Sequence, residues 1–338
     1  MEVQTIDPQE VVTTEEPKQR HGKELILASK PFATEDRRRS WWEVISTLLL
    51  LIVTGAATFY GPWPGRIAAG VVSGLLIVRF FVIYHDYLHK AILQKSALAE
   101  GIMTLFGLFV LAPTTIWRRT HDHHHHHNSK LSSGGIGSYP LVSKAKFHRL
   151  SASQRTAYLA ARHPLTIFFG YLTLFIYDFN LKSVFKNPRV HGDSLVALLL
   201  HVAVGGLIFY GGGWSALAVS WLLPFMLAHG LGSYLFYVQH NFPGAVFEES
   251  HAWEYTGAAL RSTSFLVMSP LMNYFTGNIG YHHVHHINHR IPFYRLPEAM
   301  EQMPELQRAT TITLHPRDVV RCLRLKVWDS ERKAMTGL

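Results

Sequence analysis

Three groups of histidines in this 338-residue chain have spacings that suit metal binding. The first group, His85 and His89, is four residues apart, so on a helix the two rings share one face with Cβ atoms about 5–6 Å apart. The other two groups repeat the spacing i, i+3, i+4, which directs three imidazoles toward one side of a helix. Their members are His121, His124 and His125, and His282, His285 and His286. Two copies of this spacing beside a pair predict a shared metal centre.

The number of candidate ligands predicts more than one metal ion. His240, at the end of an apolar run, brings the candidates to nine, which exceeds the capacity of one ion. Imidazole binds Zn, Cu, Fe and Ni, so the ligand type alone does not name the metal. The single cysteine, Cys322, leaves no cysteine-based zinc or iron–sulfur site and no disulfide. Glu248 with His251 is the one match to the Glu-x-x-His motif of soluble di-iron bundles, which disfavours that class.

The second group admits more than one assignment of its ligands. The histidine run continues to His127, so His123, His126 and His127 satisfy the same spacing. A low-complexity histidine tract is the alternative interpretation of this run. The third group has a single assignment, and by analogy we expect the second group's ligands to be the earlier set, His121, His124 and His125.

The composition places these histidines in a membrane protein. The chain is 48% hydrophobic and 12% aromatic but only 16% charged, whereas a soluble domain carries about 25% charged residues. The net charge of +9 is accompanied by no nucleic-acid-binding motif, so we expect no nucleic-acid partner and relate the charge to membrane topology.

Four apolar runs approach the length that a membrane-spanning helix needs, which is roughly 17–25 residues. They cover residues 44–60, 67–84, 195–210 and 214–238. Short Gly- and Pro-rich turns at 61–65 and 211–213 join them into two antiparallel hairpins. Two shorter runs, 101–112 and 165–177, favour re-entrant or interfacial segments. The predicted fold is therefore an all-α integral membrane protein with two transmembrane hairpins, short interfacial helices and a cytosolic, histidine-rich cap.

Basic residues predict the orientation of these hairpins. Of the 32 Lys and Arg, all but Arg66 and Arg79 lie outside the paired spans and their turns, which places the rest in the cytosol. If neither short run spans the membrane, all nine histidines lie on that cytosolic face. We expect residues 1–40 to form a disordered cytosolic tail and residues 41–338 to form the membrane domain, in the cell inner membrane if the source is bacterial.

From about residue 41 to residue 296 the chain resembles the integral-membrane fatty-acid desaturases, which share their plan with related hydroxylases and ketolases. The resemblance rests on His85-Asp86-x-x-His89, Trp117 before His121, Val238-Gln239-His240, and the stretch 276–292, which is similar to bacterial acyl-lipid desaturases. It implies a di-iron centre that uses O₂ and two electrons to remove two hydrogens from an acyl chain. The implied ligands are His85, His89, His121, His124, His125, His240, His282, His285 and His286, with no further catalytic residue or cofactor.

The resemblance also implies partners. The substrate would be a long acyl chain on a membrane lipid or a fatty acyl thioester. No His-Pro-Gly-Gly motif of a fused cytochrome b5 domain is present, so the electrons would come from a separate donor of ferredoxin, flavodoxin or cytochrome b5 type. The bulky residues inside the first box, Tyr87 and Leu88, depart from many family members.

Several polar residues have two possible roles. Metal-bound histidines donate their second N–H to an oxygen, which makes Asp86, Asn241 and Asn278 candidates for orienting them, although caps and turns use the same residue types. His201 and His229 lie within apolar runs, where they could line an acyl channel or hydrogen-bond to a neighbouring helix.

Two competing functions follow from the same residues. Hydroxylation or ketolation also begins with hydrogen abstraction, and the boxes do not separate these outcomes from desaturation. A divalent-metal transporter with a histidine-rich loop is the alternative from another class. Transporters usually hold coupling ions near the bilayer midplane in broken helices, whereas these clusters end spans, which disfavours transport.

Overall fold

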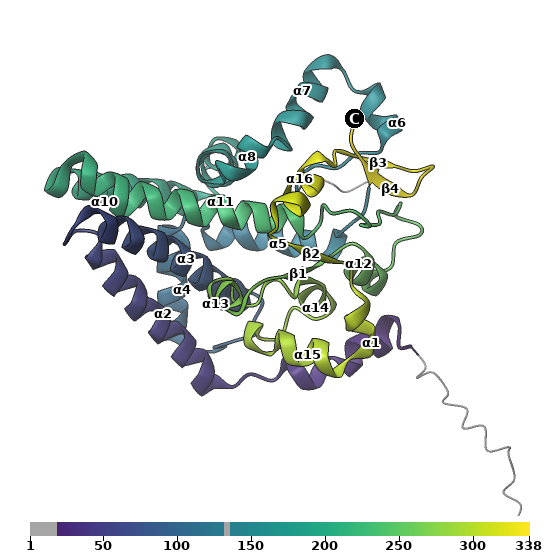
Figure 1. Cartoon of the computed structure of the whole chain (residues 1–338), viewed down its shortest axis with the longest axis horizontal. Coiled ribbons are helices and arrows are strands. Elements are labelled where there is room, and N and C mark those ends of the chain that lie inside the picture. The colour runs from purple at the N-terminus through teal and green to yellow at the C-terminus, as the bar shows by residue number, and fades with distance from the viewer. Residues whose placement is uncertain (1–18, 132–135) are drawn as a thin grey trace, which may run out of the picture.

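Long apolar helices form one end of the molecule, and short elements form the other (Figure 1). The computed structural model describes residues 19–131 and 136–338. The long elements are α2 (Arg37–Ala57), α3 (Trp63–Leu88), α10 (Gly192–Leu217), the π-helical turn η3 (Ala218–Leu222) and α11 (Leu223–Val238). The sequence therefore predicted helices in the right places for all four long runs.

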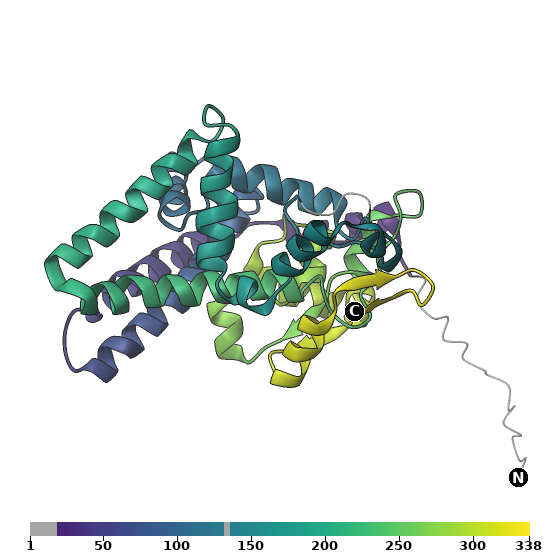
Figure 2. The same cartoon turned by 90° about the horizontal axis from the view of Figure 1, so that it is seen from above.

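The chain reverses direction within α10, four residues before the end of that element. Gly213 interrupts the helical backbone there with a φ of 64°, a conformation that favours glycine. Figure 2 shows the two arms that leave this point. By length and composition, three helical segments of the described chain could cross a membrane: Arg37–Ala57, Trp63–Leu88, and Gly192–Val238, which contains the reversal.

Two shorter helices meet at a sharp bend. α4 (Ala97–Phe109) and α5 (Thr114–His127) make an angle of 89°, so the pair is either a broken span or a re-entrant loop. The second short apolar run falls on α8 (Pro164–Phe168) and the π-helical η2 (Tyr171–Leu181), which are not among the candidate spans of the described residues. The re-entrant or interfacial character expected of the two short runs therefore stays a prediction.

The region after α11 contains strands as well as short helices. Its helices are α12 (Tyr255–Arg261), α13 (Pro270–Phe275), α14 (His282–Ile287), η4 (Phe293–Arg295), α15 (Leu296–Gln302), η5 (Pro304–Arg308) and α16 (Pro316–Arg324). β1 (Phe265–Val267) pairs in parallel with β2 (Thr311–Thr313), and β3 (Val327–Asp329) pairs antiparallel with β4 (Ala334–Thr336). The all-helical expectation missed these strands because three residues are too few to show an alternating pattern.

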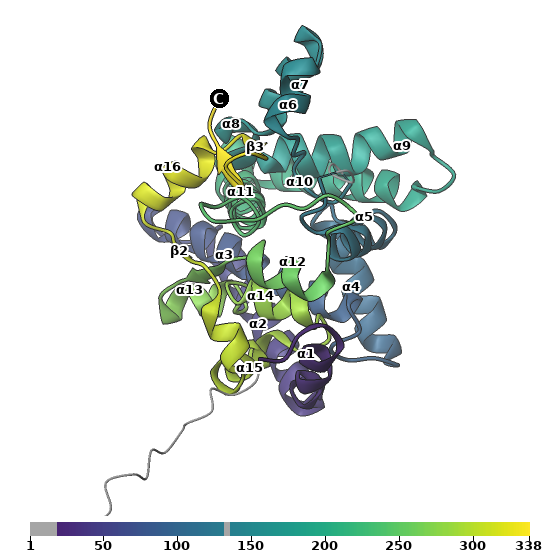
Figure 3. The same cartoon turned by 90° about the vertical axis from the view of Figure 1, so that its right-hand side faces the viewer.

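A helical arm projects from the molecule beside its C-terminus (Figure 3). The arm consists of α6 (Lys144–Arg149) and α7 (Ala152–Ala161). A separate short helix, α9 (Lys182–Lys186), follows η2. The base of the arm is held by the backbone N–H of Trp328, which donates to the carbonyl of Val142 at 3.1 Å.

The N-terminal segment is folded from residue 19 onward. α1 (Gly22–Ala28) and η1 (Lys30–Ala33) bury Leu25 and Phe32 against the short elements. Arg20 forms an ion pair with Glu305 at 2.7 Å. The expected tail over residues 1–40 is therefore structured in its second half, because two apolar side chains in a polar run suffice to dock it. Residues 1–18 lie outside the described residues.

Candidate metal centre

The nine predicted histidines converge in two neighbouring groups at the ends of α3, α5, α11 and α14. Group A consists of His85, His89, His121, His125 and His285, and group B consists of His124, His240, His282 and His286. Within each group the ring nitrogens lie within 4.8 Å of one another. Eight of the nine residues are buried, and His240 is partly exposed.

Helix geometry explains why α5 and α14 each contribute to both groups. Four residues advance a helix by about 400°, so His121 and His125 nearly share one face, whereas three residues leave His124 about 60° to the side. On α14, His285 faces group A, and His282 and His286 face group B. The spacing i, i+3, i+4 therefore serves two adjacent sites rather than one.

The Nε2 atoms within each group lie at the separation expected of ligands on one ion. In group A, His121 Nε2 is 2.9 Å from His85 Nε2 and 3.1 Å from His125 Nε2. In group B, His282 Nε2 is 2.9 Å from His240 Nε2 and 3.1 Å from His286 Nε2. Two nitrogens bound at about 2.1 Å and at right angles lie about 3 Å apart. His121 in group A and His282 in group B each lie between two other rings. The one N–H of such a ring can donate to only one of its two neighbours, whereas a cation between the rings accepts a lone pair from each of them.

The electrostatics of the rings also favour metal binding. Loss of hydration lowers the pKa of His240 to about 3. Burial, followed by the proximity of other histidines, lowers the pKa of His282, His285 and His286 well below the usual value. The rings are therefore neutral near pH 7, which is the form that binds metals. His89 Nε2 is buried within group A and has no hydrogen-bond partner among the described residues, as expected of an atom that awaits a ligand.

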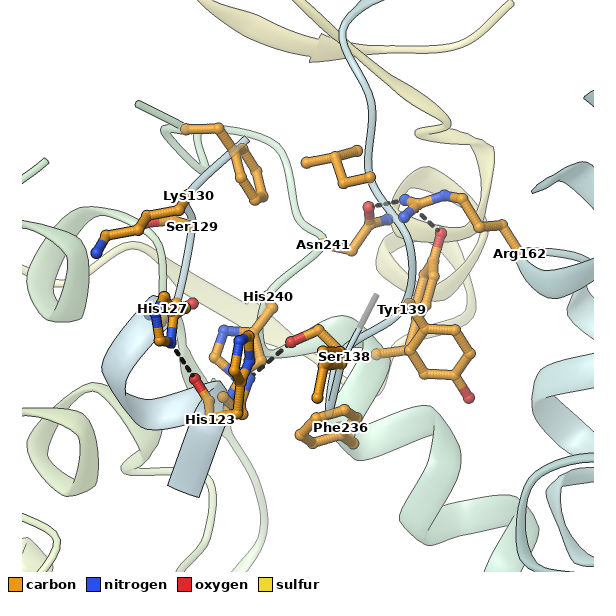
Figure 4. Close-up of a pocket in the computed structure, with 16 residues that line it drawn as sticks. His123, His127, Ser129, Lys130, Ser138, Tyr139, Arg162, Phe236, His240 and Asn241 are labelled. Carbon is orange, nitrogen blue, oxygen red and sulfur yellow. Dashed lines mark hydrogen bonds between the residues drawn. The ribbon is translucent and has the colours of Figure 1, made fainter. Parts of the chain in front are cut away.

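Of the three residues expected to orient histidines, Asp86 contacts one. Its Oδ1 is 3.1 Å from His85 Nδ1, and its Oδ2 accepts from the backbone N–H of Phe293 at 2.6 Å. The hydrogen bonds of the other two among the described residues lead elsewhere. Asn241 donates to the carbonyl of Cys322 at 2.8 Å and accepts from Arg162 (Figure 4), and Asn278 donates to the carbonyl of Phe293 at 3.2 Å.

The structure adds contacts that the sequence did not indicate. Ser138 Oγ lies 2.8 Å from His124 Nδ1, and the ring of Trp117 stacks on His121 at 4.8 Å. The ring of His289 lies 4.8 Å from that of His89. The four-residue spacing of His285 and His289 could have predicted that this tenth histidine lies beside group A. No spacing pattern could have predicted the contact of Ser138.

The remaining histidines of the second run lie outside both groups. His126 is exposed and contacts the carbonyl of Asp122 at 2.7 Å. His123 and His127 stack on each other at 4.0 Å and line a small pocket of about 50 Å³ beside His240 (Figure 4).

A second, larger cavity of about 890 Å³ reaches both histidine groups. His85 and His121 of group A and His282 of group B line it. Most of its wall is apolar and comes from α3, α5, η2 and α11, with aromatic side chains that include Phe81, Trp117 and Phe175. Its lining also includes charged side chains, namely the ion pair of Lys182 and Asp178 at 2.5 Å and the exposed Lys186 and Arg119.

Comparison with known proteins gives consistent matches over most of the chain. A family model described as "Fatty acid desaturase" matches residues 61–317. The chain is 30% identical to a protein of Bacillus subtilis named "Fatty acid desaturase" over 271 residues, which are 79% of this chain and 76% of that protein.

More distant relatives carry more specific names. A protein of Glycine max named "Omega-6 fatty acid desaturase, chloroplastic" is 28% identical over 72% of this chain, but the alignment spans only 57% of that longer protein. A protein of Anabaena variabilis named "sn-1 oleoyl-lipid 12-desaturase" is 24% identical over 72% of this chain and 70% of its own length.

Proposed function

Because this chain belongs to the fatty acid desaturase family, whose members are oxidoreductases, we propose that it introduces a cis double bond into a long acyl chain. The observation that carries the proposal is the common cavity of about 890 Å³, to which both histidine groups contribute rings. A predominantly apolar cavity that ends at metal-binding side chains is suited to holding a chain of methylenes beside a metal centre.

The proposed cofactor is a pair of iron ions, one in each group. Iron bound there would supply the chemistry of O₂ activation. The nine imidazoles would hold the ions, Asp86 would fix the orientation of the His85 ring, and the stacked Trp117 would restrain His121. The reaction consumes O₂, two electrons and two protons and yields an alkene and two water molecules, so a separate electron donor is required.

The proposed substrate is an acyl lipid. Two observations support this proposal: the names of the relatives from Anabaena variabilis and Synechocystis specify a lipid-bound oleoyl chain, and exposed cations are among the residues that line the cavity. Lys182 and Lys186 would lie beside a phosphate of the headgroup while the acyl chain lies along the apolar wall.

The product test uses a host that lacks the activity. Cells that express the protein are expected to gain a cis-unsaturated acyl chain, detected by mass spectrometry of their lipids, only when O₂ is supplied. His285→Ala should remove the product because it removes a group A ring, and His251→Ala should keep it because His251 is exposed and belongs to neither group. A hydroxylated or keto product without a new alkene would favour the related hydroxylases or ketolases. Metal uptake without altered lipids would favour transport.

We further propose four membrane crossings by α2, α3, α10 and α11. Large apolar side chains on α2 and α10 face outward, with Ile52 66% exposed on α2 and Val202 73% exposed on α10. His85 near the end of α3 and His240 after α11 belong to neighbouring groups, so both helices would end on the same side. The excess of Lys and Arg outside the paired spans supports the proposal that this side faces the cytosol. A reporter fused after Leu338 is expected to be active only in the cytosol, and activity confined to the opposite side would contradict this topology.

A further inference from the structure

The turn between α4 and α5 is a segment of irregular backbone buried among helices. Val110, Leu111 and Ala112 are all 0% exposed, and Leu111 has a positive φ of 58°. Irregular backbone at membrane depth is tolerated where its polar groups are paired, because an unpaired carbonyl in apolar surroundings costs several kcal/mol. The partners of these three carbonyls therefore decide whether the turn can exist.

Each carbonyl of this turn lies within hydrogen-bond distance of a side chain from a different element. The Tyr84 hydroxyl of α3 donates to Ala112 O at 2.8 Å. The Asn180 amide of η2 donates to Leu111 O at 2.7 Å. His229 Nε2 of α11 lies 2.9 Å from Val110 O, and its Nδ1 lies 2.8 Å from the carbonyl of Phe225 one helical turn earlier. A neutral ring donates from only one of these nitrogens, and the tautomer protonated at Nε2 links α11 to the turn. His229 also lines the cavity of about 890 Å³, so the structure supports both roles considered for it, at the cavity wall and in contact with a neighbouring segment.

Two of these donors lie on the helices that lead to the histidine groups. Tyr84 immediately precedes His85 of group A. His229 lies eleven residues before His240 of group B, about three helical turns along the same helix and its C-terminal extension. The turn itself leads into α5, which contributes to both groups. Residues 110–112 are therefore a common attachment point for three of the elements that carry the histidines.

Little space is available for this attachment to shift. A Cβ added at Gly107 would lie 2.6 Å from Tyr84 Oη, which is closer than side chains approach. On the far side of the turn, Asp193 of α10 accepts from the backbone N–H of Thr115 at 3.1 Å and from its hydroxyl at 2.6 Å. The first turn of α5 is thus fixed against α3, α10 and α11 together.

We propose that Tyr84 and His229 are positioning residues, which act through the carbonyls of Ala112 and Val110 to set the separation of groups A and B. This inference rests on the proposed function, in which both groups hold iron. α5 supplies His121 and His125 to one group and His124 to the other, so a shift of its first turn alters both groups at once.

The test compares variants that remove one hydrogen bond with variants that keep it. Tyr84→Phe deletes only the hydroxyl, and His229→Leu deletes the donor, whereas His229→Gln retains an N–H donor. The matched control is Tyr210→Phe, which deletes a hydroxyl on a side chain that is 91% exposed. Each iron-loaded protein is measured for iron content, for iron–iron separation by X-ray absorption, and for kcat and KM.

We expect Tyr84→Phe and His229→Leu to change the iron–iron separation and to lower kcat about three- to twenty-fold, the ratio that corresponds to the free energy of one hydrogen bond within a membrane protein. KM should stay unchanged for Tyr84→Phe, whereas His229→Leu also alters the wall of the cavity and is judged by the iron–iron separation and kcat. His229→Gln should restore much of the loss, and Tyr210→Phe should match the wild type. If Tyr84→Phe and His229→Leu lower only the thermal stability and keep the wild-type iron separation and kcat, the positioning role is wrong. A wild-type protein that holds two irons but forms no alkene would overturn the proposed function alone, because the iron separation still reports on the turn.

Discussion

Replacing His125 by alanine is expected to abolish the product, whereas replacing the adjacent His126 should leave most of the activity. His125 is buried, and its Nε2 lies 3.1 Å from the Nε2 atoms of both His121 and His285. Loss of a partner that merely orients a metal ligand costs about 10–100-fold, so loss of a ligand should exceed about 100-fold. His126 is exposed and belongs to neither group. The measurement is alkene formation in membranes with equal amounts of each variant.

Metal analysis of the same proteins checks the cause of the loss. The wild type and His126→Ala should each bind two irons per chain, and His125→Ala should bind fewer because group A has lost a ring. His124→Ala should instead deplete group B. The reverse pattern, with His126 essential and His125 dispensable, would assign the ligands to the alternative set of the histidine run. One zinc per chain without iron would contradict the proposed cofactor.

The second large effect is expected from Arg79, the single arginine of a long apolar run. Its side chain is 5% exposed and forms an ion pair with Glu43 of α2, itself 13% exposed. It also donates to Thr47 Oγ1 at 3.2 Å and lies 3.9 Å from the centre of the Tyr274 ring. Arg79→Met should lower the free energy of unfolding by about 3–5 kcal/mol, because it removes the buried partner of a largely buried carboxylate and leaves only the exposed Arg39 beside it.

Glu43 offers a matched control for this prediction. Arg39 contacts the same carboxylate at 3.7 Å but is 51% exposed, so Arg39→Met should cost no more than about 1 kcal/mol. Thermal unfolding in detergent micelles measures both variants. A double variant, Arg79→Met with Glu43→Met, should recover part of the loss because no unpaired charge remains. Equal shifts for Arg79→Met and Arg39→Met would show that the buried pair contributes no more than the exposed one.

Local spacing in the sequence predicted which histidines would lie together. His121, His124 and His125 are neighbours on one helix, so their geometry follows from the helical repeat alone. The lengths of the apolar runs similarly predicted α2 and α3. Both features depend on residues that are close in sequence, where physical rules are strongest.

Features that depend on distant residues could not be predicted in this way. Asn241 follows His240 directly, yet its amide group is held by Arg162, which lies 79 residues earlier. Ser138 contacts His124 from the far side of a loop, and Val110 O meets His229 across 119 residues. Such contacts form when the helices pack together, and the hydrophobic periodicity of the sequence does not predict them.

Each histidine group combines residues from early and late parts of the chain, so each group is completed only late in synthesis. His125 and His285 meet across 160 residues, and His124 and His286 meet across 162. At roughly 5–20 residues per second, the ribosome needs about 8–32 s to add that length of chain. During this interval the nascent protein contains α3 and α5 with neither group complete. Of group B only His124 belongs to the early part of the chain, so in the proposed function the metal of group B can bind only after α14 has been made. With the proposed topology, that step comes after the insertion of α3 into the membrane.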